Sequence, residues 1–119
     1  MNKVFLASDH GGYALRSFLT QELRSQGFEI ADLGCPTPQS VDYPIYAEAV
    51  ASKVQETKEA RGILVCGTGI GMAIAANKLH GIRAVVANDL FSARLSRQHN
   101  DANVLCLGGR IVAPALALE

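Results

Sequence analysis

The sequence predicts one α/β domain built on a doubly wound, five-stranded parallel sheet with helices on both faces. Three observations predict it. Short apolar runs typical of buried strands alternate with segments of helical periodicity along the whole chain. Polar or glycine-rich turns follow most of the strand-like runs. The 119 residues suffice for one hydrophobic core, so we expect residues 1–119 to form a single domain.

The elements follow from apolar spacing and from the glycines and prolines between them. Five runs read as strands, over residues 3–8, 28–33, 63–66, 82–87 and 104–107. The helical segments are one that Gly27 ends, then 45–58, 70–79 and 91–98, and a last one that begins at 113. Residues 34–44 read as a loop. Right-handed crossovers between parallel strands would then give a Rossmann-like sandwich.

Composition excludes several classes of protein. Hydrophobic residues make up 49% of the chain and charged residues 18%, which argues against disorder. The formal net charge is zero, so no basic excess indicates nucleic-acid binding. No apolar run approaches the ~20 residues of a membrane span, and none resembles a signal peptide. The widely spaced Cys35, Cys66 and Cys106 fit neither a disulfide framework nor a zinc knuckle, and predict a cytoplasmic protein.

Polar residues gather where four of the predicted strands end. They lie at positions 9–10, 66–68, 88–89 and 108–110. In parallel α/β sheets, ligands bind beyond the carboxyl ends of the strands. The sequence therefore predicts a ligand site at that edge.

The run from Cys66 to Gly71 is the strongest single signal. Gly67, Gly69 and Gly71 make a turn between a strand and a helix, which would present backbone amides to an anion. Met72 excludes both a GxGxxG dinucleotide fingerprint and a C-x5-R phosphate loop, and no Gly-Lys-Ser/Thr follows as in a P-loop. A tight turn without a ligand is the alternative. Cys66 is either a thiolate stabilised beside the helix or a small buried residue.

Other polar residues also have two interpretations. Asp9 and His10 either cap a helix or contact a sugar and its phosphate. Tyr43, in an Asp-Tyr-Pro sequence, either belongs to a rigid turn or lies over the site. His99 and Asn100 either end a helix or, in the case of the histidine, supply a general acid or base.

Three further residues are interpreted from their positions alone. Arg110 follows two glycines and is placed to hold a phosphate through a forked hydrogen bond. Cys106 is expected in the core, and Cys35 has no assigned role. Arg83 is expected at the surface, away from the site.

Together, these motifs resemble the type B ribose-5-phosphate isomerase family, which includes the allose- and galactose-6-phosphate isomerases of bacteria. The matching segments are SDHGGYALR at 8–16, DYP at 42–44, CGTGIGMAIAANK at 66–78, GIRAVVAND at 81–89 and ARLSRQHNDANVLCLGGR at 93–110. They keep the order and spacing of the family over nearly the whole chain.

The resemblance implies the isomerisation of an aldose phosphate to a ketose phosphate, first of all ribose 5-phosphate to ribulose 5-phosphate. The family works without a metal or an organic cofactor. Cys66 would move a proton between C1 and C2 through a cis-enediolate. The amides of the loop, at Gly67, Gly69, Ile70 and Gly71, would stabilise that intermediate.

The resemblance also assigns the remaining site residues. Thr68 and His99 match positions that open the sugar ring. His10 and Arg110 match phosphate-binding positions. The residues that match sugar contacts are Asp9, Tyr43 and Asn100.

The family forms homodimers or homotetramers with sites at the subunit interface, so His99 and Asn100 are expected to serve a neighbour's site. Its members usually continue through a further C-terminal helix, and residues 1–119 are expected to form a domain without it. The alternative function is therefore a phosphosugar-binding subunit, or one subunit of a paired galactose-6-phosphate-type isomerase that is inactive alone.

Overall fold

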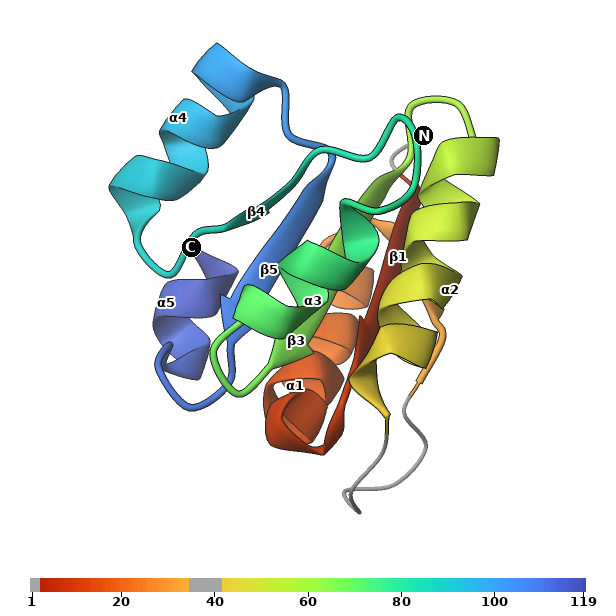
Figure 1. Cartoon of the computed structure of the whole chain (residues 1–119). Helices are drawn as coiled ribbons and strands as arrows, with labels where there is room; N and C mark the ends of the chain where they lie inside the picture. The colour runs from red at the N-terminus through yellow and green to blue at the C-terminus, as the bar shows by residue number, and fades with distance from the viewer. Residues whose placement is uncertain (1–2, 35–41) are drawn as a thin grey trace.

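A computed structural model describes residues 3–34 and 42–119 of the chain. Its five strands are β1 (Lys3–Ser8), β2 (Glu29–Asp32), β3 (Arg61–Cys66), β4 (Ala84–Val86) and β5 (Val104–Gly108). They form one fully parallel sheet in the order β2-β1-β3-β5-β4 (Figure 1). The predicted fold class is thus confirmed. Cys35 and most of the predicted 34–44 loop lie outside the described residues.

The helices cover both faces of the sheet. They are η1 (His10–Gly12, a 3-10 turn), α1 (Tyr13–Ser25), α2 (Tyr43–Glu56), α3 (Ile70–Ala76), α4 (Leu90–Asn100) and α5 (Pro114–Leu118). In Figure 1, α2 and α3 lie in front of the sheet and α1 lies behind it. Helix α5 packs beside α1 on the far face. The chain moves from β1 outward to β2 and then to β3 on the other side, so β1 and β3 flank the topological switch point.

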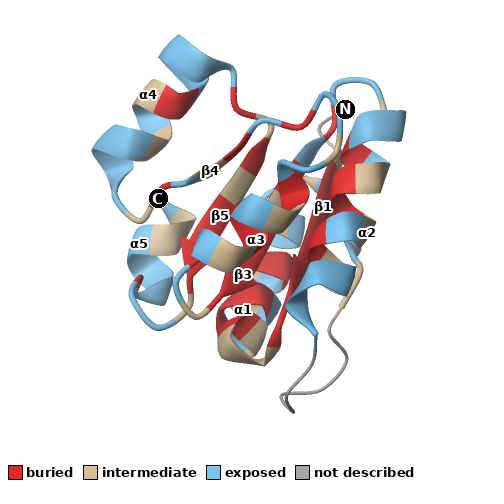
Figure 2. Cartoon of the chain, viewed as in Figure 1, coloured by how far each residue is buried: buried red, intermediate tan, exposed pale blue. Residues whose placement is uncertain are grey.

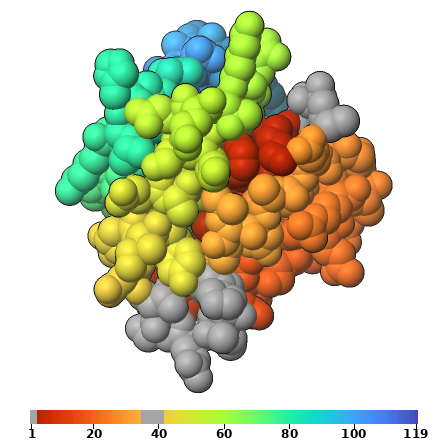
Figure 3. Space-filling model, turned by 90° about the vertical axis from the view of Figure 1, so that its right-hand side faces the viewer, coloured from red at the N-terminus to blue at the C-terminus, as the bar shows by residue number. Residues whose placement is uncertain are grey.

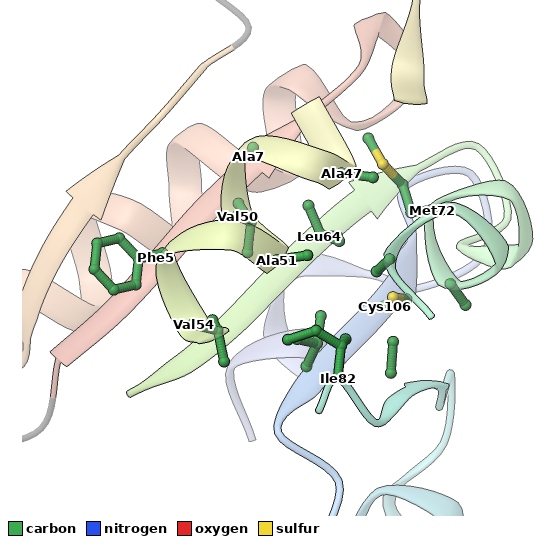
Figure 4. Packing of buried hydrophobic residues seen from close by; sticks show 14 of the residues in the cluster. Phe5, Ala7, Ala47, Val50, Ala51, Val54, Leu64, Met72, Ile82 and Cys106 are labelled. Carbon is green, nitrogen blue, oxygen red and sulfur yellow. The ribbon is translucent and has the colours of Figure 1, made fainter. Parts of the chain in front are cut away.

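Two hydrophobic clusters fill the two faces. The larger one joins α2 and α3 to the sheet through small and branched side chains (Figure 4). Its residues include Phe5 from β1, Val50 from α2, Leu64 from β3 and Cys106 from β5. The smaller cluster lies under α1 and α5. Because both faces are covered, the central strands β1, β3 and β5 are nearly continuous apolar runs.

Strand β2 forms one edge of the sheet, beside α1 and α2 (Figure 3). It has four residues, with the charged Glu29 and Asp32 at its ends, as is common for edge strands. Asp32 accepts a hydrogen bond from the buried guanidinium of Arg16, which also donates to Ser8 Oγ at 2.9 Å. This cluster fixes α1 against the carboxyl ends of β1 and β2.

Helix α4 is the least buried of the longer helices. It carries one buried residue, Ser96, and its surface is mostly exposed (Figure 2). Asp89 caps its first turn by accepting a hydrogen bond from Ser92 N at 2.7 Å, and this hydrogen bond lowers the pKa of Asp89. The helix starts near the carboxyl edge of the sheet and ends near the opposite edge (Figure 1).

Several element boundaries differ from the prediction. Helix α3 ends at Ala76, three residues early, because the Asn77 side chain bonds the backbone of Ala84 and turns the chain toward β4. Helix α4 continues to Asn100, where Asp101 ends it with a left-handed φ of 49°. The 3-10 turn η1 was not predicted. In the described residues, no helix is long and apolar enough to cross a bilayer.

Candidate active site

Three loops meet at the carboxyl edge of the sheet, after β1, β3 and β5. They pack backbone against backbone, which only glycine permits. A Cβ on Gly12 would lie 2.5 Å from Val65 O, and a Cβ on Gly109 would lie 2.5 Å from Gly11 O. Cys66 O accepts a hydrogen bond from Gly109 N at 2.7 Å. The predicted convergence of polar loops therefore exists, and glycine contacts hold it together.

Cys66 is the last residue of β3 and is 6% exposed. Its Sγ accepts a hydrogen bond from the backbone N–H of Gly69 at 3.0 Å. Gly69 has a φ of +88°, which glycine adopts without the steric clash that a Cβ would cause, and this lets the loop fold back over the thiol. A backbone N–H aimed at sulfur stabilises a thiolate. Gly69 is the N-cap residue of α3, so the donor that holds the thiol lies at the start of the helix, where the sequence placed it.

Cys106 lies in the core, as predicted, and is a different kind of thiol. Burial, and secondarily the charge of Cys66, raise the pKa of Cys106 to about 12. Cys106 therefore stays a neutral thiol at physiological pH. In the described part of the chain, both cysteines are free.

The amides of the 67–71 loop were predicted to face an anion. Two of these amides already donate hydrogen bonds to nearby side chains. Gly69 N donates to Cys66 Sγ, and Ile70 N donates to Thr68 Oγ1 at 3.2 Å. A substrate oxygen bound here would share or replace these partners. Thr68, within the loop, is exposed.

Asp9 and His10 follow β1 directly. Asp9 is buried, and its Oδ1 accepts a hydrogen bond from Gly11 N at 2.8 Å, which caps the 3-10 turn. The capping interpretation of Asp9 is confirmed, and its predicted sugar contact stays a prediction. His10 is the half-buried first residue of that turn. A Cβ on Gly11 would lie 3.0 Å from Gly67 N, so this turn touches the loop after Cys66.

Arg110 and Tyr43 flank the same loop from two sides. The Arg110 side chain lies over Gly67, with Nη1 3.4 Å from where a Gly67 Cβ would be. Its backbone N donates to Gly67 O at 3.1 Å. Tyr43 is the first residue of α2, and its ring carbons lie 3.0 Å from where a Gly71 Cβ would be. An exposed guanidinium and a phenol thus stand beside the amide loop.

His99 and Asn100 are not brought to Cys66 within one chain. They are the exposed last residues of α4. The chain just beyond them runs along the amino edge of the sheet, where Gly62 N donates to Asn103 O at 2.9 Å and Arg83 pairs with Asp101. Cys66 lies at the opposite edge. Within one chain, the predicted site residues therefore form two separate groups. His99 and Asn100 lie near the amino edge of the sheet, and the others lie at the carboxyl edge with Cys66.

Asn88 is one of the polar residues that follow the predicted strands, and the sequence alone assigns it no role. In the structure, its side chain bonds both the 67–71 loop and the end of β5. Its position after β4 was the available signal. Its partners could not be predicted, because they lie 20 residues away in each direction. In the described residues, no group of three His, Cys, Asp or Glu side chains is placed to hold a metal ion.

Comparisons with known proteins match nearly the whole chain. A family model described as Ribose/Galactose Isomerase matches residues 4–119. The chain is 47% identical over 117 residues to ribose-5-phosphate isomerase B of Escherichia coli (strain K12), which covers 98% of this chain and 78% of that protein.

Solved structures give the same result. Ribose-5-phosphate isomerase B of Clostridium thermocellum superimposes with a TM-score of 0.93 at 48% identity, over 98% of this chain and 78% of that one. The enzyme of Mycoplasma genitalium, solved with bound ribulose-5-phosphate, gives a TM-score of 0.93 at 39% identity, over 98% of this chain and 78% of that one.

Proposed function

Because the chain belongs to the ribose/galactose isomerase family, we propose that it interconverts aldose and ketose sugar phosphates, with ribose 5-phosphate and ribulose 5-phosphate as its substrate pair. The observation that carries the proposal is the Cys66 thiol, fixed by the Gly69 N–H at the carboxyl edge of the sheet. The relative solved with ribulose-5-phosphate supports this choice of substrate.

In the proposed reaction, the Cys66 thiolate removes the proton from C2 of the open-chain aldose. The C2–H electrons form the C1=C2 bond, and the carbonyl electrons move to O1, which gives a cis-enediolate. The protonated thiol then returns a proton to C1. The hydroxyl proton moves from O2 to O1, so that C2–O2 becomes the ketone and O1 becomes the hydroxyl of C1. A proton next to a carbonyl is weakly acidic, so nearby amides of the 67–71 loop must stabilise the oxygen charge as it develops.

The phosphate serves as a remote anchor that fixes the substrate over the thiol. We assign this anchor to His10 and Arg110. Arg110 is supported by its place over Gly67, and His10 by its place in the turn that touches the same loop. Asp9 and Tyr43 are proposed to contact the sugar, and Thr68 to assist ring opening.

We further propose that the working enzyme is a homodimer or larger homo-oligomer whose sites combine residues of two copies. His99 and Asn100 would then come from the partner subunit, which accounts for their distance from Cys66. Ile70 and Ile74, on one side of α3 beside the loop, are 55% and 59% exposed, as expected of an apolar interface surface. The free thiols of Cys66 and Cys106 support a reducing, cytoplasmic setting.

The direct test is to follow the purified protein with ribose 5-phosphate in D2O by NMR. We expect ribulose 5-phosphate to form with deuterium incorporated from solvent, because an enediolate exchanges its proton through the thiol. Allose 6-phosphate and galactose 6-phosphate, tested in parallel, measure the preference between five and six carbons. Binding of all three sugars without turnover would contradict the proposal and favour a phosphosugar-binding subunit.

Shared sites predict complementation between two inactive variants. Cys66→Ala and His99→Ala proteins are each expected to be inactive. When the two are co-expressed at equal levels, half of the dimers are mixed and hold one intact site of two, so about a quarter of the wild-type activity should return. Each variant co-expressed with itself is the control. Failure of the mixed sample to exceed these controls would contradict a shared site.

A further inference from the structure

Both the oxygen and the nitrogen of the Asn88 side-chain amide form hydrogen bonds with backbone groups. Its Oδ1 accepts a hydrogen bond from Gly108 N at 2.8 Å, and its Nδ2 donates to Thr68 O at 3.2 Å. Just before it, Ala87 N donates to Cys106 O at 3.2 Å, which keeps this segment alongside β5. Asn88 therefore ties the 67–71 loop to the end of β5.

The bond to Thr68 O sets the direction of the next N–H. In a planar trans peptide, the C=O and the N–H point in opposite directions. Thr68 O and Gly69 N belong to the same peptide group. When Asn88 holds the carbonyl on one side, the Gly69 N–H must point to the other side, where Cys66 Sγ accepts it at 3.0 Å.

Close packing limits how far this peptide can turn by itself, but does not fix it. A Cβ on Gly69 would lie 3.1 Å from the backbone carbon of Leu107, so the loop rests on β5. Gly69 has a φ of +88° and belongs to the residue type with the widest backbone freedom. A peptide next to glycine needs a partner to keep one orientation.

We propose that Asn88 is a positioning residue for Cys66: it orients the Thr68–Gly69 peptide so that the Gly69 N–H stabilises the thiolate. The role in catalysis rests on the proposed function, whereas the effect on the thiol does not. Removing the Asn88 amide frees the peptide to turn, weakens the N–H···S bond and makes the thiolate harder to form.

The two hydrogen bonds of the Asn88 side chain go to backbone groups and to none of the titratable side chains around Cys66. Those side chains come from each element packed against the loop, and they are Cys106 on β5, Arg110 after β5, Tyr43 on α2, and Asp9 and His10 after β1. An uncharged substitution at Asn88 adds no new charge to this set. A shift in the thiol's pH profile would therefore report the lost hydrogen bond.

The chain offers a matched control in Asn77. Its side chain also bonds one backbone N–H and one backbone carbonyl, those of Ala84, at 2.8 and 2.9 Å. It does so at the start of β4, at the end of that strand away from Asn88. Asn77→Ala and Asn88→Ala thus each remove two hydrogen bonds of the same kind. Only those of Asn88 involve the loop beside Cys66.

The test is the rate of Cys66 alkylation by iodoacetamide as a function of pH. Cleavage after Arg61 and Lys78 gives a tryptic peptide, residues 62–78, that contains Cys66 and no other cysteine, so mass spectrometry follows this thiol alone. Cys106, on another peptide, should stay unmodified in the folded protein, because burial raises its pKa to about 12. Its labelling therefore monitors unfolding.

We expect Asn88→Ala to slow alkylation of Cys66 about tenfold at pH 7 and to move the midpoint of the profile about one pH unit higher. Asn77→Ala should stay within about twofold of wild type at every pH. If Asn88→Ala does not fold, Asn88→Ser replaces it in the same measurement. A profile for the Asn88 variant that overlays the wild type, or an equal shift in the Asn77 variant, would overturn the proposal.

This measurement uses no substrate, so it stands even if the protein isomerises none of the sugars tested. Where isomerase activity is present, the Asn88 variant should lose kcat about tenfold, with KM changed less than twofold. An equal change in KM would instead indicate a misplaced binding site, and would also overturn the positioning role.

Discussion

Replacing Cys66 by alanine is expected to lower kcat for ribose 5-phosphate at least about 10³-fold, because the change removes the base that takes the proton from C2 in the proposed reaction. The free energy of unfolding should fall by only about 1 kcal/mol, since the change removes one sulfur and leaves the Gly69 N–H without its acceptor. Substrate affinity should change little, because His10 and Arg110 hold the phosphate in the proposed site. The measurements are kcat by NMR, unfolding by denaturant and binding by calorimetry.

Cys106→Ala is the matched control for this experiment. It removes the same atom from the neighbouring strand, at a thiol that burial keeps protonated. Because Cys106 is fully buried, this variant should lose about 1 kcal/mol of stability and keep its activity. A Cys66→Ala protein that is folded and retains wild-type turnover would contradict the role of Cys66 as the base. Loss of activity in both variants would indicate a structural effect.

Local sequence pattern was enough to predict most of the fold. The apolar run of β3 follows Gly62, which packs beneath α2, and it ends at Cys66, just before the glycine loop. Such runs are strongly constrained, because both faces of a parallel sheet are buried. The clustering of polar residues at strand ends predicted that these loops converge at the carboxyl edge, and it did so without any knowledge of strand order.

Long-range contacts explain what the sequence could not predict. The position of β5 between β3 and β4 depends on pairing across the sheet, and no local signal specifies it. The early end of α3 depends on the bonds between Asn77 and Ala84, and the attachment of the 67–71 loop depends on Asn88. The separation of His99 from Cys66 follows from α4 running back to the opposite edge. In each case a distant partner decides the geometry.

Gly109→Ala is expected to destabilise the protein by about 3 kcal/mol and to abolish activity. The new Cβ would lie 2.5 Å from Gly11 O and 3.1 Å from Gly12 Cα. Both are backbone atoms of the turn after β1, so neither can move aside as a side chain would. The turn and the β5 loop must separate, which would also break the 2.7 Å bond from Gly109 N to Cys66 O.

Gly67→Ala, in the neighbouring loop, is the control that isolates this steric effect. Its Cβ would first meet Arg110 Nη1 at 3.4 Å, an ordinary contact with the end of a flexible side chain. Its stability should therefore stay within about 1 kcal/mol of wild type, even if binding suffers. Urea unfolding followed by circular dichroism compares the two. Equal stability losses would mean that any side chain in these loops is harmful, and would refute the interlocked glycines as the feature that holds the three loops together.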